Sequence, residues 1–308
     1  MTESVLHLDD FAQLCGTTLD EFPEAAVSIA SSRDFRYRRL TGAERDAQLC
    51  QIVRRIIDGD MWVSGPDKQH IWDGGWSENL EEYRRTRSLD ALAPKFLRPQ
   101  VLRLFGDYVD PVSPRFEFDV VDVFRHWLFS RYLNKVSGIY EFGCGSAQHM
   151  PVYAKLFSGI PVTGLDWSPV SSEIISLLAA DYGWPLSARR FDFFKPDCDF
   201  TLASGAGVVT VGALEQLGSN FGAFLGYLLE QKPAVVINVE TITEMYDPDN
   251  LVDYLALAYD RRRGYLTGWL TTLRELEQQG VVRILRSFKT QIGGRFHDSY
   301  CTVVWTPA

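Results

Sequence analysis

Apolar and polar residues alternate with two different periodicities in the second part of the chain, from Ser137 onward. Short runs rich in β-branched and aromatic residues predict strands, and longer segments with apolar residues three and four apart predict helices. We expect strands near residues 138–142, 161–165, 187–193, 207–211, 233–240, 281–288 and 299–305. We expect helices near residues 148–157, 170–181, 218–230, 248–262 and 267–279. Strands that alternate with helices indicate an α/β fold built on a doubly wound, mostly parallel seven-stranded sheet.

The last two expected strands differ from the others because no convincing helix lies between them, only the segment from Gln291 to His297. Parallel neighbours need a longer crossover connection, whereas antiparallel neighbours do not. We therefore expect an antiparallel hairpin at the end of the sheet.

The first part of the chain has a different pattern, which is mostly helical. Thr41 and Glu44 form a capping box, and the helix that they open keeps its apolar positions at helical spacing until Gly59. A second, charged helix is expected from Ser77 to about Arg87.

A break from Pro94 to Pro114 separates these helices from one that Asp119 is expected to cap. The chain is therefore predicted to divide near residue 115. Residues 1–115 form a mostly helical cap that shapes a binding site, and residues 116–308 form the larger domain.

The segment 60–76 holds three tryptophans, Trp62, Trp72 and Trp76, together with glycines and a proline. A loop rich in both aromatic and turn residues is ordered when it packs on something. Two interpretations stay open: a lid over a binding site, or a loop packed in a small satellite core.

Composition and charge narrow the class of protein. The chain has 308 residues, 46% of them hydrophobic and 23% charged, as is ordinary for a soluble globular protein. No apolar run approaches the ~20 residues of a membrane helix, and the start of the chain lacks the pattern of a signal peptide, so we expect a cytoplasmic protein without a membrane partner. The net charge of −9 argues against a nucleic acid as partner. The five cysteines form no Cys-x-x-Cys pair, so neither a metal site nor a disulfide framework is predicted.

The segment 138–147 carries the clearest chemical signature. An expected strand ends in a carboxylate, Glu141, and Gly143 and Gly145 follow at once. The next expected strand ends in another carboxylate, Asp166. This succession is the outline of a Rossmann-type site for an adenosine-containing cofactor.

Two details of this segment favour one cofactor. A dinucleotide site needs a third glycine where the helix approaches the pyrophosphate, and Gln148 stands there instead. The carboxylate of Glu141, at the end of the first strand, suits a cofactor that carries a cationic amino group. Both details favour S-adenosylmethionine (SAM) over a nicotinamide dinucleotide.

These motifs resemble those of the class I, Rossmann-fold SAM-dependent methyltransferases. The segment 210–217 is similar to the stretch after that family's fourth strand, with Gln216 where a histidine is frequent. The resemblance covers roughly residues 116 to 308 and looks most like bacterial small-molecule or sugar-modifying members. The acids and glycines that match the first three motifs are Glu141, Gly143, Gly145, Asp166 and Asp192.

The resemblance implies which residues hold the cofactor. Asp166 is expected to accept both ribose hydroxyls, and Asp192 to accept from the adenine amine, while the Phe193 backbone N–H reaches a ring nitrogen. Trp167 is expected to pack on the adenine face. Each of these acids, taken alone, is also compatible with a helix cap. The expected cofactor-binding residues are Glu141, Gly143, Cys144, Gly145, Asp166, Trp167, Asp192, Phe193 and Val211.

The sequence offers few groups that can handle the methyl acceptor. Glu240 ends the fifth strand and His297 precedes the last one, where the crevice of such a sheet opens. We expect these two to be catalytic, with a general base needed for a hydroxyl acceptor but not for an amine. His149 and Glu215 rank behind them, and all four are also compatible with structural roles.

The predicted function is transfer of a methyl group from SAM to an oxygen or nitrogen atom of a small molecule, such as a sugar or another metabolite, which leaves S-adenosylhomocysteine (SAH). Two alternatives stay open: a non-catalytic SAM- or SAH-binding module that acts through a partner, and an NAD-dependent oxidoreductase. Arginine clusters such as residues 261–263 are typical of solvated helix faces, with an acidic or phosphorylated acceptor as the alternative.

Overall fold

The computed structural model describes residues 3–97 and 100–308. Met1 and Thr2, at the start that is expected to lack a signal peptide, lie outside the described residues, as do residues 98–99 of the expected break. Within the described ranges, none of the helices is both long and apolar enough to cross a membrane.

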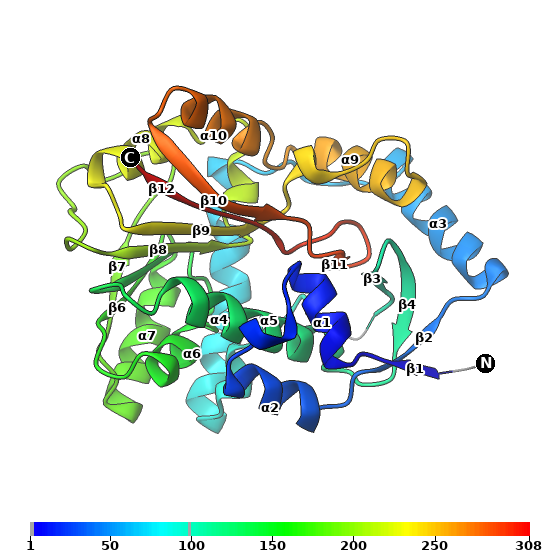
Figure 1. Cartoon of the computed structure of the whole chain (residues 1–308), viewed down its shortest axis with the longest axis horizontal. Helices are drawn as coiled ribbons and strands as arrows, with labels where there is room; N and C mark the ends of the chain where they lie inside the picture. The colour runs from blue at the N-terminus through cyan, green and yellow to red at the C-terminus, as the bar shows by residue number, and fades with distance from the viewer. Residues whose placement is uncertain (1–2, 98–99) are drawn as a thin grey trace.

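The larger of two sheets has seven strands within the described residues, in the order β10-β12-β9-β8-β5-β6-β7 (Figure 1). Its neighbours pair in parallel except at β12, which runs antiparallel to both β9 and β10. The doubly wound, mostly parallel α/β fold is confirmed, and the antiparallel final strand is inserted between β9 and β10. The strands are β5 (Ile139–Phe142), β6 (Val162–Asp166), β7 (Leu186–Arg190), β8 (Gly207–Val211), β9 (Val235–Glu240), β10 (Val282–Phe288) and β12 (Cys301–Pro307).

The central strands are buried on both faces, which explains their nearly continuous apolar runs. Every residue of β9 is buried, and so are all residues of β8 except the last, Val211. The helices of this part of the chain are α5 (Phe116–Tyr132), α6 (Met150–Leu156), α7 (Pro169–Tyr182), α8 (Gly222–Gln231), α9 (Leu251–Arg263) and α10 (Trp269–Gln278). Short 3₁₀ turns include η4 (Leu214–Leu217), directly after β8.

A second, antiparallel sheet gathers strands from both ends of the chain, in the order β1-β2-β4-β3-β11. The hairpin of β3 and β4 lies inside the break expected over residues 94–114, so that expectation was wrong there. Its turn residues Phe105 and Gly106 have φ values of 52° and 75°, as a two-residue type I′ turn requires. The strands are β1 (Glu3–Val5), β2 (Arg36–Arg39), β3 (Leu102–Leu104), β4 (Asp107–Pro111) and β11 (Ile292–Gly293).

The N-terminal helices are α1 (Leu8–Cys15), α2 (Glu24–Ser32), α3 (Gly42–Ile57) and α4 (Gln69–Thr86). The capping box of α3 is confirmed by reciprocal bonds between Thr41 and Glu44. The division of the chain near residue 115 stays a prediction, and β11, far along the chain, pairs with the N-terminal strand β3.

Helix α4 begins at Gln69, eight residues before the expected start at Ser77. Adjacent glycines at 74 and 75 made this stretch look like a loop, because each costs about 1 kcal/mol in a helix relative to alanine. Trp72, Trp76 and Tyr83 nevertheless stand at helical spacing, so packing of their aromatic side chains outweighs the low helix propensity of the glycines.

Asp119 does not cap its helix as expected. Helix α5 already begins at Phe116, and Asp119 is buried in the first turn. A carboxylate there still suits the positive end of the helix dipole.

Candidate functional site

A large cavity of about 520 Å³ opens beside the carboxyl ends of β5, β6 and β8. Its floor is the glycine loop after β5, and tryptophans 62, 72 and 76 of the N-terminal region line it as well. The rings of Trp72 and Trp76 are stacked with centroids 5.6 Å apart. The segment 60–76 therefore combines features of both interpretations, because its tryptophans pack on one another and also line the cavity.

The glycine loop is shaped so that only glycines fit. Gly143 and Gly145 have φ values of +72° and +53°, in the region that side chains disfavour. A Cβ at position 143 would lie 2.3 Å from the Cβ of Ala213, and one at 145 would lie 2.7 Å from the indole of Trp76. At these two positions the loop therefore presents backbone to whatever the cavity holds.

Glu141 lies buried beneath this loop and faces the cavity. Burial raises the pKa of its carboxyl group to about 8 because a charged carboxylate is poorly solvated there. Its Oε2 atom has no hydrogen-bond partner among the described residues. A buried carboxyl group with a free oxygen is suited to a cationic amino group, which would restore its ionised form.

Asp166 ends β6 at the edge of the same loop. Its two oxygens accept hydrogen bonds from the backbone N–H groups of Gly145 and Ser168, each at 2.8 Å. Burial raises the pKa of Asp166 to about 6, while these two bonds oppose the rise. The carboxylate is thus fixed in place and ionised at neutral pH, with lone pairs left for hydroxyl donors.

The other expected cofactor residues line the cavity with one exception. Cys144, Trp167, Phe193 and Val211 are part of its wall, and burial raises the pKa of the Cys144 thiol well above its usual value, so it remains uncharged. Asp192 is not part of the wall. Its Oδ1 accepts the Phe194 backbone N–H at 2.8 Å, and its expected contact with adenine stays a prediction.

His297 is held by a carboxylate on the other side of the cavity. Its Nδ1 lies 2.7 Å from Oδ1 of Asp260, the same carboxylate that accepts the Thr241 hydroxyl at 2.9 Å. Burial opposes the charged imidazole, but the charge and hydrogen bond of Asp260 outweigh it and raise the pKa of His297. With Nδ1–H donated to Asp260, Nε2 is the ring nitrogen that remains to accept a proton.

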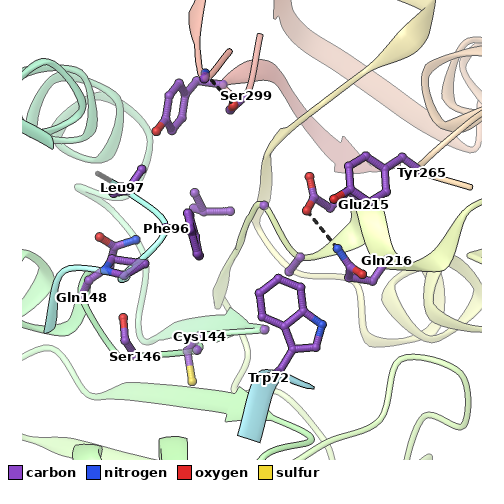
Figure 2. Close-up of a pocket in the computed structure, with 18 of the residues that line it drawn as sticks. Trp72, Phe96, Leu97, Cys144, Ser146, Gln148, Glu215, Gln216, Tyr265 and Ser299 are labelled. Atoms are coloured by element: carbon purple, nitrogen blue, oxygen red, sulfur yellow. Dashed lines mark hydrogen bonds between the residues drawn. The ribbon is translucent and has the colours of Figure 1, made fainter. Parts of the chain in front are cut away.

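Glu215, on the turn η4, lines the cavity beside Tyr265 and accepts a hydrogen bond from Gln216 at 2.9 Å. Figure 2 shows Glu215 and Tyr265 on the opposite side of the pocket from Gln148 and Leu97. Burial raises the pKa of Glu215 to about 7, so its protonation changes near neutral pH. Glu215 therefore joins His297 as a titratable group on the acceptor side.

The structure does not bring Glu240 to the cavity, in contrast to the sequence prediction. It is fully buried, and its oxygens accept the backbone N–H groups of Ala213 and Glu215 at 3.3 and 3.4 Å. The end of β9 lies beneath the turn that follows β8, so the carboxyl group holds that turn instead of facing the crevice. Burial raises the pKa of Glu240 to about 8.

His149 does reach the cavity wall, but its environment disfavours proton uptake. Burial and then the nearby charge of Arg125 lower its pKa well below the usual range. The imidazole therefore stays neutral, and its Nε2 has no partner among the described residues.

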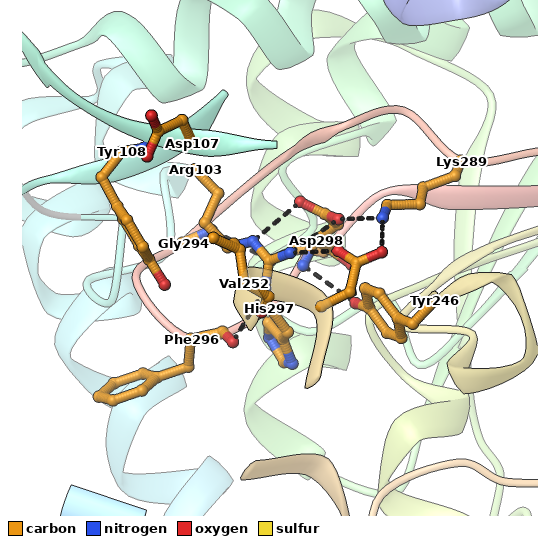
Figure 3. Close-up of polar contacts among 12 residues, drawn as sticks. Arg103, Asp107, Tyr108, Tyr246, Val252, Lys289, Gly294, Phe296, His297 and Asp298 are labelled. Atoms are coloured by element: carbon orange, nitrogen blue, oxygen red, sulfur yellow. Dashed lines mark hydrogen bonds and ion pairs between the residues drawn. The ribbon is translucent and has the colours of Figure 1, made fainter. Parts of the chain in front are cut away.

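The loop that carries His297 is tied to the N-terminal region by a buried arginine (Figure 3). Arg103 of β3 is fully buried and donates to Asp253 at 2.8 Å and to Asp298 at 3.3 Å. It also donates to the Phe296 carbonyl at 3.3 Å. Sequence reasoning missed Arg103 and Asp260, because nothing in their local patterns shows that the fold brings them to this loop.

Among the described residues, no three His, Cys, Asp or Glu side chains lie close enough together to hold a metal ion.

Neither a protein-family model nor a curated protein matches this sequence. Solved structures do match. A geranyl diphosphate methyltransferase in complex with GPP and sinefungin is 11% identical, with a TM-score of 0.48, and the match covers 78% of this chain and 97% of that one. Magnesium protoporphyrin IX methyltransferase from Synechocystis PCC 6803 with bound SAH is 16% identical, with a TM-score of 0.45 and coverage of 62% and 84%. A SAM-dependent methyltransferase from Aquifex aeolicus is 14% identical, with a TM-score of 0.41 and coverage of 58% and 86%.

Identities this low concern the fold alone, and TM-scores below 0.5 carry no argument about activity. The chain itself has the α/β fold class that its resemblance to class I methyltransferases implied, with the antiparallel final strand. Its function has to be inferred from the residues around the cavity.

Proposed function

We propose that this protein is a SAM-dependent methyltransferase that acts on an oxygen or nitrogen atom of a small molecule. The observation that carries the proposal is one cavity with two kinds of wall. One wall joins the glycine loop to the carboxyl groups of Glu141 and Asp166, and the other presents His297 and Glu215.

The residues present fit SAM at the first wall. The orphaned Oε2 of Glu141 suits the amino group of the methionine part, and the glycines at 143 and 145 leave space that a Cβ would fill. Asp166 is suited to the ribose hydroxyls, while Trp167 and Phe193 offer apolar faces for adenine. Bound there, SAM supplies an electrophilic methyl group on a good leaving group.

Catalysis by the protein then consists mainly of alignment and proton handling. The cavity holds the acceptor against the cofactor wall and excludes water, and Nε2 of His297 takes the proton of a hydroxyl acceptor. Asp260 is a positioning residue in this scheme, because it fixes the tautomer and orientation of the imidazole. An amine acceptor would need only its neutral form.

A transfer assay tests the proposal. The protein is incubated with SAM carrying a deuterated methyl group and a panel of small hydroxyl and amine compounds, and products are detected by mass spectrometry. We expect at least one acceptor to gain the labelled methyl group with matching release of SAH. SAH binding without transfer to any compound would contradict the enzyme and favour the non-catalytic SAM-binding alternative.

A further inference from the structure

Two arginines lie on the cavity wall without a carboxylate in ion-pair contact among the described residues. Arg263 is the last residue of α9, and Arg295 lies in the loop after β11. Among the described residues neither forms an ion pair, and the Nε atom of each is buried without a hydrogen-bond partner. Both arginines are half-buried, and a partly desolvated cation that lacks an anion is less stable than one that has it, so an anionic partner is expected from outside the chain.

Arg263 is fixed in place by aromatic rings. Its guanidinium carbon lies 3.9 Å from the ring centroid of Trp62 and 4.7 Å from that of Tyr265. Its Nη1 donates to the Tyr259 hydroxyl at 2.9 Å. Ser64 donates from its backbone to the carbonyl of Arg263 at 2.8 Å, which holds the Trp62 segment against the end of α9. Cation–π contacts orient the guanidinium group and leave its charge unneutralised.

The carboxyl groups that line the same cavity supply only part of the missing charge, although Glu215 is close enough for the charge of Arg263 to lower its pKa against the effect of burial. Asp260 is engaged with His297. Burial raises the pKa of both Glu117 and Glu215 to about 7, so each is only partly ionised at neutral pH. The acceptor side of the cavity therefore carries a surplus of positive charge inside a protein whose net charge is −9.

We infer that the methyl acceptor is an organic anion whose carboxylate or phosphate group binds Arg263, with Arg295 as a second cation. Its apolar or planar body packs on the aromatic wall around these arginines, formed by Trp62, Tyr265 and Phe296. This inference rests on the proposed function, because it names the chemical class of the substrate for the same cavity.

Calorimetry with matched probes tests the inference. Benzoate, 4-hydroxybenzoate and indole-3-acetate are titrated against their uncharged amides, and phenyl phosphate against phenol, each with saturating SAH. We expect at least one acid to bind about 10- to 100-fold more tightly than its neutral partner, as for hydrogen bonds to a charged group. The carboxylates and the phosphate distinguish the two kinds of anion. Equal binding of acid and neutral probe throughout the panel, or binding of none, would overturn the inference.

Variants of the two arginines then test which residue causes the preference for the acid over its neutral partner. Arg263→Gln should remove most of the preference for the acid and leave the affinity of the neutral probe unchanged. Arg261→Gln, an exposed position on the same helix, is the matched control and should keep the preference. If Arg263→Gln does not fold, as judged by its thermal melting, Arg295→Gln takes its place and should weaken the same preference. If the folded variant still prefers the acid over the neutral probe, the substituted arginine has only a packing role and the inference is rejected.

The same titrations separate this inference from the proposed function. Binding of SAH without any selectivity for acids would reject only the anionic acceptor. Arginine-dependent binding of an acid by a protein that does not bind SAH would reject the methyltransferase.

Discussion

The two walls of the cavity are built in different ways. The cofactor wall comes mainly from consecutive strand ends and loops between residues 141 and 211, so short motifs describe it. The acceptor wall brings together Trp62, Glu117, Glu215, Arg263 and His297 from distant parts of the chain. The first wall is encoded locally and the second by tertiary assembly, so variants should affect the functions of the two walls separately.

The largest effect is expected from His297→Asn. Loss of the general base should lower the rate of methyl transfer to a hydroxyl acceptor by roughly 100- to 10,000-fold, with the affinity for SAH unchanged. His70→Asn, at an exposed histidine, is the matched control and should keep both properties. A parallel loss of SAH affinity in His297→Asn would show that the two walls are not separable.

The pH profile sharpens the same prediction. Only neutral His297 can accept a proton, so the rate should fall as pH drops through its pKa, which Asp260 raises. Asp260→Asn should therefore move this acidic limb to lower pH while it also lowers the maximal rate. An unshifted limb would mean that another group, such as Glu215, governs the profile.

Arg103→Met should cost about 3 kcal/mol of stability, because it leaves Lys289 as the remaining ion-pair partner of the buried carboxylates of Asp253 and Asp298 among the described residues. Chemical unfolding measures this loss, and Arg39→Met, at an exposed position of the same sheet, serves as control. In the folded fraction, acceptor turnover should suffer and SAH affinity should not. Weakened SAH binding with unchanged acceptor turnover would contradict the assignment of Arg103 to the acceptor wall.

Asp166→Asn should weaken SAH binding by about 10- to 100-fold, the scale of hydrogen bonds to a charged group. In the wild type, SAH affinity should also fall as pH drops below about 6, where the buried Asp166 becomes protonated. The amide variant should lose the step near pH 6 and keep the change towards pH 8 that the ionisation of Glu141 contributes. Titration calorimetry between pH 5 and 8 checks both points, and a variant that binds as tightly as the wild type would remove Asp166 from the site.

The smallest effect on turnover is expected from Glu240→Gln, which should keep the transfer rate within a few-fold. Burial raises the pKa of Glu240 to about 8, above its unfolded value. The stability that its protonated form contributes is fully present below pH 4.5, the ordinary pKa, and is lost as pH rises from there through about 8. The glutamine variant should show a weaker loss of stability over this range in melting experiments. A large loss of turnover in this variant would instead support the expectation that Glu240 is catalytic.

The sequence was informative wherever a local pattern corresponds to a local structure. Strand positions, the capping box of α3 and the glycine loop all follow from short-range spacing. Helix α4 was misplaced because Gly74 and Gly75 lower helix propensity locally, whereas the packing of Trp72 and Trp76 decides the structure. The sequence did not show that Glu240 lies away from the cavity, because its position at a strand end does not reveal which loop covers it.

The acceptor wall lay largely beyond local patterns for the same reason. His297 was found from its place before the last strand, but Asp260, its partner, is 37 residues away in the chain. Arg263 was visible only as one of three consecutive arginines. The two neighbours are exposed, and only Arg263 turns towards the cavity.

The most direct test of the central claim is a calorimetric titration of the wild-type protein with SAH and, separately, with NAD⁺. The Gly143–Gly145 loop, the unpaired Oε2 atom of Glu141 and the presence of Gln148 where a dinucleotide site has its third glycine predict tight SAH binding and no detectable NAD⁺ binding. Tight binding of NAD⁺ with none of SAH would contradict the account and favour a nicotinamide-dependent enzyme.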